Sequence, residues 1–245
     1  MFEVHGETDV GRRRQLNEDA IFAADGLFIV CDGMGGHKAG EVASRLATDV
    51  IANFIKRSQN DPELTWPCGF DPRLSEDANR LSTAIKLANR TVFHTAQSSD
   101  DYSGMGTTVV AVLVAPGRAE MTYGHVGDSR IYLIRDGAMT QLTKDDSLVN
   151  LVSADDAPAV KNVLTKALGV QEDVEFEVVG KELQAGDIVL LCSDGLTNML
   201  PDPAILEVVT AQAGPLEEAC RHLVAGANAQ GGRDNISVLL VRYGG

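Results

Sequence analysis

The residues best suited to chemistry are four aspartates, each beside an apolar, strand-like run: Asp32, Asp128, Asp194 and Asp234. Glycine adjoins the first three of them. A single aspartate at the end of a strand is usually a turn residue or a cap. Four in that position, with Glu18-Asp19 at the start of a further strand, favour a shared site over four separate turns.

Carboxylates gathered at the edge of a core repel one another, and the pKa of each rises unless a cation lies between them. Carboxylate oxygens, a glycine carbonyl and water are the preferred ligands of hard divalent ions such as Mg²⁺ and Mn²⁺. Gly33, directly after Asp32, would let the main chain approach such an ion closely. The spacing of the acids does not fit a calcium-binding helix-loop-helix, which needs alternating acids within one loop.

Arg14 adds positive charge beside these acids, four residues before Glu18 and five before Asp19. Its forked guanidinium suits a phosphoryl group. On residue type alone, a solvated basic turn over Arg12–Arg14 is an equally good interpretation. A divalent metal, an arginine that binds phosphate and acids that orient water together describe metal-assisted hydrolysis of a phosphate ester.

Two other chemistries fit the sequence less well. A cysteine phosphatase needs an arginine six residues after its nucleophile, but His37 follows Cys31 at that spacing and Asn198 follows Cys192. One histidine and one glutamate, His37 and Glu41, do not make a zinc site. Both alternatives are therefore set aside.

The charge balance excludes further classes of partner. The 245 residues include 35 Asp+Glu and 21 Lys+Arg, which gives a net charge of −14 and a pI near 4.7. Binding to a nucleic-acid backbone relies on clustered cations, so we expect no nucleic-acid partner. The longest uncharged apolar run, Thr107–Ala115, is far shorter than the ~20 residues of a spanning helix. The first residues lack the pattern of a signal peptide, so we expect a cytoplasmic protein with no membrane partner.

The elements that must position these residues are strands clustered in the middle of the chain, with helices before and after. Apolar runs and alternation predict strands over residues 2–10, 20–24, 27–31, 107–115, 119–126, 130–135, 139–142, 175–179, 188–192 and 236–242. Helical spacing predicts helices over 39–56, 75–97, 203–210 and 215–229, with a proline-rich loop over 58–72. Short turns between the strands indicate antiparallel hairpins. The pattern predicts one α+β domain over residues 1–245.

Several segments resemble a known family. Gly11–Asp19 and Cys31–Ala43 resemble the opening motifs of the bacterial form of the metal-dependent protein phosphatases of type 2C. The resemblance runs from Val4 to Val241. The later motifs match in the same order: Ser103–Thr108, Val126–Arg130, Leu142–Asp145, Ser193–Leu196 and Gly232–Ile236.

The resemblance implies a four-layer α-β-β-α sandwich of two antiparallel sheets flanked by helix pairs. It implies hydrolysis of phosphoserine and phosphothreonine by a hydroxide activated at a binuclear Mn²⁺ or Mg²⁺ centre. Residue by residue, Asp32 would bridge both ions, the Gly33 carbonyl would bind one of them, and Asp194 and Asp234 would hold the other. Glu18 and Asp19 would orient water, Arg14 would bind the substrate phosphate, and Asp128 would hold a third ion with Asp194.

The sequence also departs from the family pattern. Met34 stands where animal members carry a histidine, and Asp146 stands beside Asp145 where a histidine is usual. The flap expected over 147–163 is shorter than in bacterial relatives. The catalytic residues are therefore intact, while the sequence leaves substrate choice and control by the flap open.

The expected partners are phosphorylated proteins and a cognate Ser/Thr kinase whose action the chain reverses, and we expect a monomer. Two alternatives remain open. The first is a pseudophosphatase that binds phosphoproteins without turnover, against which the intact Arg14, Asp32, Asp194 and Asp234 argue. The second is a phosphatase of small phosphate esters, which the sequence leaves open because it reveals no specificity pocket.

Overall fold

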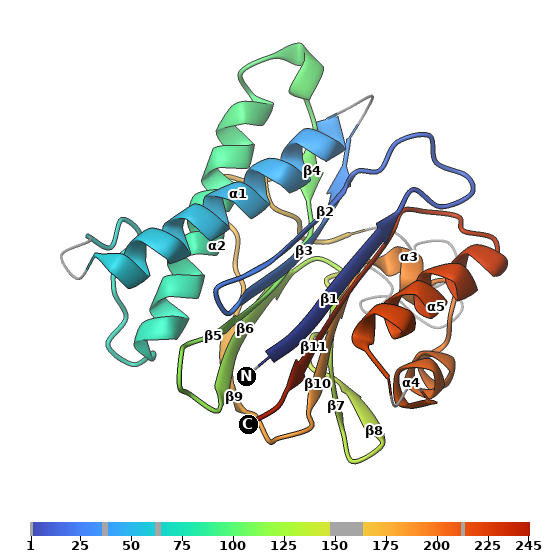
Figure 1. Cartoon of the computed structure of the whole chain (residues 1–245). Coiled ribbons are helices and arrows are strands. Elements are labelled where there is room, and N and C mark those ends of the chain that lie inside the picture. Colours follow the sequence, from blue (N-terminus) through green and yellow to red (C-terminus); the bar gives the residue numbers. More distant parts are fainter. Residues whose placement is uncertain (1, 36–38, 62–64, 148–163, 212–213) are drawn as a thin grey trace.

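The computed structural model describes residues 2–35, 39–61, 65–147, 164–211 and 214–245. Its strands form two antiparallel sheets (Figure 1). One sheet has the order β1 (Phe2–Asp9), β11 (Ile236–Tyr243), β10 (Ile188–Cys192), β7 (Arg130–Arg135) and β8 (Ala138–Gln141). The other has the order β2 (Asp19–Ala24), β3 (Leu27–Met34), β5 (Val109–Val114), β6 (Glu120–Val126) and β9 (Val178–Glu182), with β4 (Gly106–Thr107) paired to the end of β3.

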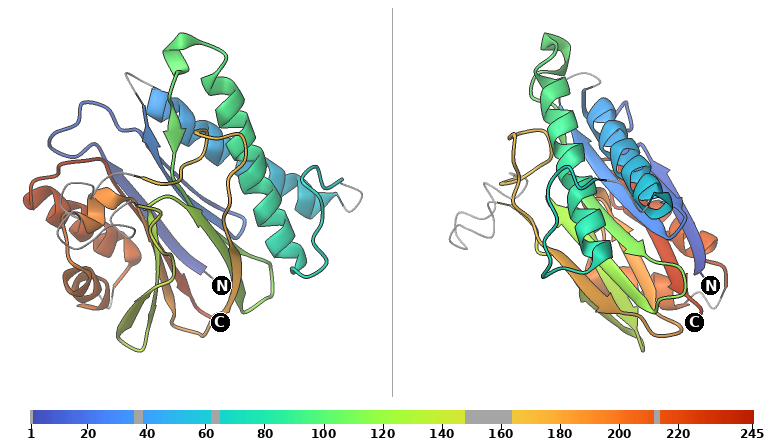
Figure 2. Two further views of the ribbon diagram at one scale, coloured as in Figure 1. Left: turned by 180° about the vertical axis from the view of Figure 1, so that it is seen from behind. Right: turned by 90° about the vertical axis from the view of Figure 1, so that its left-hand side faces the viewer.

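Helices cover the outer face of each sheet (Figure 2). The long helices α1 (Ala39–Asn60) and α2 (Glu76–Ala96) pack on the sheet that contains β3, and a short 3₁₀ turn, η1 (Asp100–Tyr102), follows α2. The helices α3 (Asp194–Thr197), α4 (Asp202–Ala211) and α5 (Leu216–Ala229) pack on the sheet that contains β11. The predicted four-layer α-β-β-α sandwich is confirmed.

The alternation of side chains along each strand explains these layers, because successive residues point to opposite faces of a sheet. In β3, Leu27, Ile29 and Cys31 pack under α1 and α2, while Phe28 and Val30 face the other sheet. Strands β5, β10 and β11 divide their apolar residues between the two faces in the same way. Both sheets are therefore buried on two sides, as continuous apolar runs such as Leu27–Cys31 predict.

Several elements differ from the prediction, and the strand expected over 107–115 is divided into β4 and β5. Helix α1 continues to Asn60, past the predicted end at Lys56, because the first helix-breaking proline is Pro62. Strand β3 continues through Asp32 to Met34, where its last residues pair with β4. The strand expected over 175–179 is β9 at Val178–Glu182, an edge strand whose side chains are mostly exposed and carry little apolar signal.

The short helix α3, Asp194–Thr197, is absent from the prediction because four residues are too few to display a helical period. Among the described residues, the structure contains no helix that is both long enough and apolar enough to cross a membrane.

Candidate active site

One cavity of about 500 Å³ opens where β3, α3 and the segments before β7 and β11 come together. It collects seven of the predicted site residues from five separate parts of the chain: Arg14, Glu18, Asp32, Gly33, Asp128, Asp194 and Asp234. The eighth, Asp19, lies behind its wall. Residues that are distant in sequence thus share one site, as the strand-end pattern predicts.

The end of β3 forms one wall of this cavity. Asp32 lies directly opposite Asp19 in the β2–β3 register. The main chain of Asp32 is fixed by Thr108, whose Oγ1 accepts a hydrogen bond from Asp32 N at 3.0 Å and whose N donates to Asp32 O at 2.8 Å. The Asp32 carboxylate is thereby held on a rigid strand rather than on a turn.

Gly33 permits a close main-chain crossing at this wall. A Cβ atom at this position would lie 2.1 Å from Gly40 O and 2.5 Å from Glu18 O. Gly33 N also donates to Glu18 O at 3.1 Å. The start of α1, the end of β3 and the segment before β2 therefore meet where no side chain fits.

Asp19 is buried, and its carboxylate is only partly hydrogen-bonded. Ser193 Oγ donates to Asp19 Oδ2 at 2.9 Å, whereas Oδ1 has no hydrogen-bond partner among the described residues. Burial raises the pKa of Asp19 to about 7. The Ser237 and Ser193 hydroxyls oppose this rise, whereas the charges of Asp194 and Asp234 add to it.

The other carboxyls of the cavity are shifted in the same direction. Burial, followed by repulsion from Asp19, Asp194 and then other acids, raises the pKa of Asp32 well above its usual range. Burial and the charge of Asp234 raise the pKa of Asp194 to about 6, and burial with Asp194 raises that of Asp128 to about 7. Asp194 Oδ2 accepts from Asn198 Nδ2 at 2.9 Å, but its buried Oδ1 has no hydrogen-bond partner among the described residues.

Arg14 is the cation that reaches this cluster from the segment before β2. Its Nη2 donates to Asp234 Oδ2 at 2.7 Å, and its Nη1 lies 4.0 Å from Glu18 Oε2. Burial raises the pKa of Glu18 although the charge of Arg14 lowers it. Because half of the Arg14 side chain is exposed at the mouth, its guanidinium can also contact a ligand in the cavity.

The chemistry of this donor set fits hard divalent cations. Buried carboxylate oxygens without partners and carboxyl pKa values raised toward neutrality describe a site whose negative charge exceeds the positive charge that the described residues supply. Within the described parts of the chain, no three acidic, histidine or cysteine side chains already converge on one point as a preformed metal cage. Water would therefore complete the coordination of each ion.

Sequence reasoning missed the residue that joins the two sides of the site. Asn235 Nδ2 donates to Val10 O at 3.0 Å and to Leu16 O at 2.9 Å, and its Oδ1 accepts from Glu18 N at 2.8 Å. It thus fastens the segment that carries Arg14 beside Asp234. Its place directly after Asp234 in the Gly232–Ile236 motif was the available signal.

Lys166 also lines the cavity and was not predicted. Its Nζ lies 3.8 Å from Asp146 Oδ1 and donates to Glu175 O at 2.9 Å. Asp146, one of the two departures from the family pattern, accepts from Gly127 N at 3.1 Å and so holds the loop that presents Asp128. Met34, the other departure, lines the cavity with a side chain that has no proton to donate. Residues 148–163 of the expected flap lie outside the described residues.

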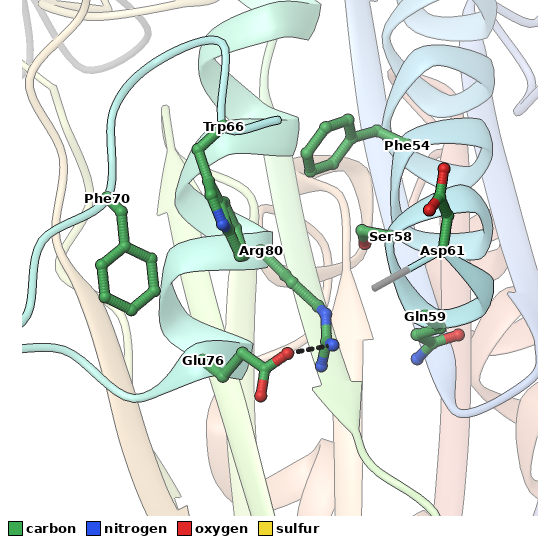
Figure 3. Close-up of a pocket in the computed structure, with 8 residues that line it drawn as sticks. All are labelled: Phe54, Ser58, Gln59, Asp61, Trp66, Phe70, Glu76 and Arg80. Carbon is green, nitrogen blue, oxygen red and sulfur yellow. Dashed lines mark hydrogen bonds and ion pairs between the residues drawn. The ribbon is translucent and has the colours of Figure 1, made fainter. Parts of the chain in front are cut away.

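A second cavity, of about 400 Å³, lies between the last turns of α1, the start of α2 and the loop that joins them (Figure 3). Phe54, Trp66 and Phe70 supply apolar surface there, and Arg80 is paired with Glu76. It contains none of the predicted site residues. We therefore place the chemistry in the first cavity.

Two helix-flanked antiparallel sheets with an acidic cavity and an arginine at one end define a class, the hydrolases that remove phosphate from proteins. The chain belongs to the protein phosphatase 2C family, which it matches over residues 10–230. It is 38% identical to the serine/threonine phosphatase stp of Listeria innocua over 97% of this chain and 95% of that protein.

Solved structures agree with this assignment. The serine/threonine phosphatase PstP/Ppp of Mycobacterium tuberculosis superposes with a TM-score of 0.83 at 33% identity, covering 100% of this chain and 99% of that chain. The catalytic domain of the serine/threonine phosphatase PstP in complex with two manganese ions superposes with a TM-score of 0.80 at 34% identity, covering 98% and 97% of the two chains.

Proposed function

We propose that this chain hydrolyses phosphoserine and phosphothreonine in proteins with the help of two Mn²⁺ or Mg²⁺ ions. Asp32 and the Gly33 carbonyl would hold one ion, and Asp194 and Asp234, with Asp32, would hold the other. The observation that carries it is the gathering of partly buried, mutually repelling carboxyls around Asp32. When bound, the ions supply positive charge and a strongly acidified water at neutral pH.

The residues of the chain would position the reactants around those ions. Arg14 would bind the phosphoryl oxygens through its guanidinium fork. Its present partner is Asp234, so a cation on Asp234 would free Arg14 for substrate. Glu18 and Asp19 would accept hydrogen bonds from water and orient it. Because Met34 cannot donate a proton, we assign to water the protonation of the departing serine or threonine oxygen.

Asp128 would add a further ion together with Asp194. Its pKa, raised to about 7 by burial and then by Asp194, supports a cation between these two carboxyls. A water acidified by that ion would be the proton source that Met34 does not supply.

The partners in this proposal are phosphorylated proteins and the Ser/Thr kinase that phosphorylates them. We place the chain in the cytoplasm as a monomer, with residues 1–245 forming one catalytic domain. The intact set of Arg14, Asp32, Asp194 and Asp234 at one cavity favours turnover over mere binding of phosphoproteins.

The test is turnover of a phosphothreonine peptide with Mn²⁺, with Mn²⁺ plus excess chelator, and with an aryl phosphate as the small-ester control. We expect metal-dependent release of phosphate from the peptide, abolished by the chelator and restored by added metal. Binding of the peptide without phosphate release would instead support the pseudophosphatase. Turnover of the aryl phosphate alone would support a small-ester phosphatase.

A further inference from the structure

Positive charge that the proposed catalysis does not use lies next to two residues of the cavity, Arg14 and Asp234. Ten arginines of the chain form an ion pair with an acidic side chain. Within the described ranges, four arginines form none: Arg12, Arg13, Arg57 and Arg233. All four are exposed, and three of them immediately precede Arg14 or Asp234.

Main-chain contacts bring these three arginines together. Arg12 N donates to Gly232 O at 2.7 Å. A Cβ on Gly11 would lie 2.2 Å from Asp234 O, and one on Gly232 would lie 2.9 Å from Arg12 Cγ. The two loops therefore touch directly. We call Arg12, Arg13 and Arg233 the arginine rim.

The charge of the arginine rim opposes that of the whole molecule. The chain has a net charge of −14, which repels a phosphopeptide that carries further acidic groups. Positive charge concentrated at the mouth of a site reverses this field locally and steers anionic ligands inward. Ten other arginines are neutralised by partners, and the rim holds three of the four described arginines that form no ion pair.

The spacing suits residues that flank the phosphorylated one. Arg12 and Arg13 lie within two residues of Arg14, which is at most ~8 Å of chain, and an extended peptide advances ~3.3 Å per residue. When Arg14 binds the phosphoryl group of a substrate peptide, the neighbouring residues of that peptide would therefore lie over the arginine rim.

We propose that the arginine rim selects phosphoprotein segments with anionic side chains, either carboxylates or a second phosphate, within about three residues of the phosphorylated site. The inference rests on the proposed phosphatase function. It names Arg12, Arg13 and Arg233 as determinants of substrate choice, separate from the groups that act on the reacting phosphate.

The experiment compares kcat/KM for four phosphothreonine peptides that differ only in their flanks: glutamate, a second phosphoserine, glutamine or lysine. For the wild type we expect about a tenfold preference for either anionic flank over glutamine, expressed mainly in KM and lost at high salt. The Arg12→Gln/Arg13→Gln/Arg233→Gln variant should lose that preference. Arg57→Gln, about 25 Å from Gly40 along α1, is the matched control and should keep it.

A preference for only one of the two anionic flanks would identify the anion that the arginine rim selects, and it would still support the proposal. Equal kcat/KM on the glutamate, phosphoserine and glutamine peptides would overturn the inference while leaving the phosphatase function intact. Preserved preference in the triple variant would overturn it as well. Absence of turnover on every peptide would instead count against the proposed function. Far-UV circular dichroism and the thermal midpoint of the triple variant establish that it is folded.

Discussion

Two aspartates of this molecule, the buried Asp187 and the half-buried Asp32, have opposite electrostatic surroundings. The Asp187 side chain is 1% exposed, and it accepts hydrogen bonds from Arg135 Nε at 2.7 Å and from Gln184 N at 2.7 Å. Burial raises its pKa, but these hydrogen bonds outweigh burial and lower the pKa overall. Asp32 lies among other acids, and burial and repulsion both raise its pKa.

This difference distinguishes a charge that stabilises the fold, Asp187, from a charge that serves a binding site, Asp32. Arg135 compensates Asp187 within the fold, so that aspartate needs nothing from solution. Among the described residues, the carboxyls around Asp32 have no such partner except Arg14, which pairs with Asp234 and Glu18, and bound ions or protons would supply the remaining charge. The fold therefore tolerates repulsion between these carboxylates, and this repulsion favours the binding of cations.

The most damaging change to the acidic site should be Asp32→Asn. We expect activity to fall by about 10³-fold or more, because a carboxylate proposed to contact both ions is lost. Metal-free stability should hold or rise, since one charge leaves a repelling cluster. Phosphate release and chemical denaturation measure the two effects. An unfolded variant, or one with near-normal turnover, would contradict the assignment.

Arg14→Ala should weaken catalysis without removing the ions. Loss of a charge-assisted contact to phosphate costs about 1.5–3 kcal/mol, or roughly ten- to a hundredfold in kcat/KM. Steady-state kinetics and Mn²⁺ binding measured side by side check this expectation. Unchanged kinetics would instead favour the interpretation of Arg14 as part of a solvated basic turn.

Arg135→Met should turn Asp187 into an uncompensated buried acid like those of the active site. We expect the unfolding free energy at neutral pH to fall, by less than for a fully buried pair because Arg135 is partly exposed. Turnover should be unaffected because the pair lies outside the cavity. Urea denaturation at several pH values would test whether the penalty shrinks as Asp187 becomes protonated. A penalty that is equal at all pH values would argue against an electrostatic cause.

Asp128→Ala should have a smaller effect, about five- to tenfold on phosphopeptides. The loss should be less on an aryl phosphate, whose leaving oxygen is a weaker base and needs less help from an acidified water. Rates on both substrates across a Mn²⁺ titration decide the point. Equal losses on the two substrates would refute the role in proton supply.

The mildest perturbation is pH. Asp19, Asp128 and Asp194 have folded pKa values of about 7, 7 and 6, above those of the unfolded chain, so the folded state binds more protons between about pH 4 and pH 7. Metal-free stability should therefore fall as pH rises through that window and level off above it. Asp187, with a lowered pKa, acts oppositely and loses its contribution as pH falls through its folded pKa.

Thermal midpoints from about pH 4 to 9, with and without Mn²⁺, check this expectation, since bound cations should remove most of the decline. A metal-free profile that rises steadily from pH 4 to 7 would contradict the raised pKa values of Asp19, Asp128 and Asp194.

The parts that sequence predicted well are those governed by local pattern. Leu27–Cys31 and Ile188–Cys192 are β3 and β10 because a buried strand is apolar on both faces, and the acids that end such runs share one cavity. Edge strand β9 was misplaced because its side chains are largely exposed.

Contacts between distant segments were beyond reach of any local pattern. The Ser193–Asp19 hydrogen bond and the Asn235 contacts to Val10 and Leu16 join residues more than 170 positions apart. Likewise, the local sequence around Lys166 does not indicate that this residue lies at the cavity.

The central claim is that the carboxyls around Asp32 form a divalent-cation site, and calorimetric titration of the metal-free chain with Mn²⁺ tests it most directly. Titrations near pH 6 and near pH 9, each in buffers of different ionisation enthalpy, count the ions bound and the protons released. We predict at least two ions per chain, with clear proton release near pH 6, little near pH 9, and greatly weakened binding in Asp32→Asn. Binding without proton release near pH 6, or binding that Asp32→Asn leaves unchanged, would contradict the account.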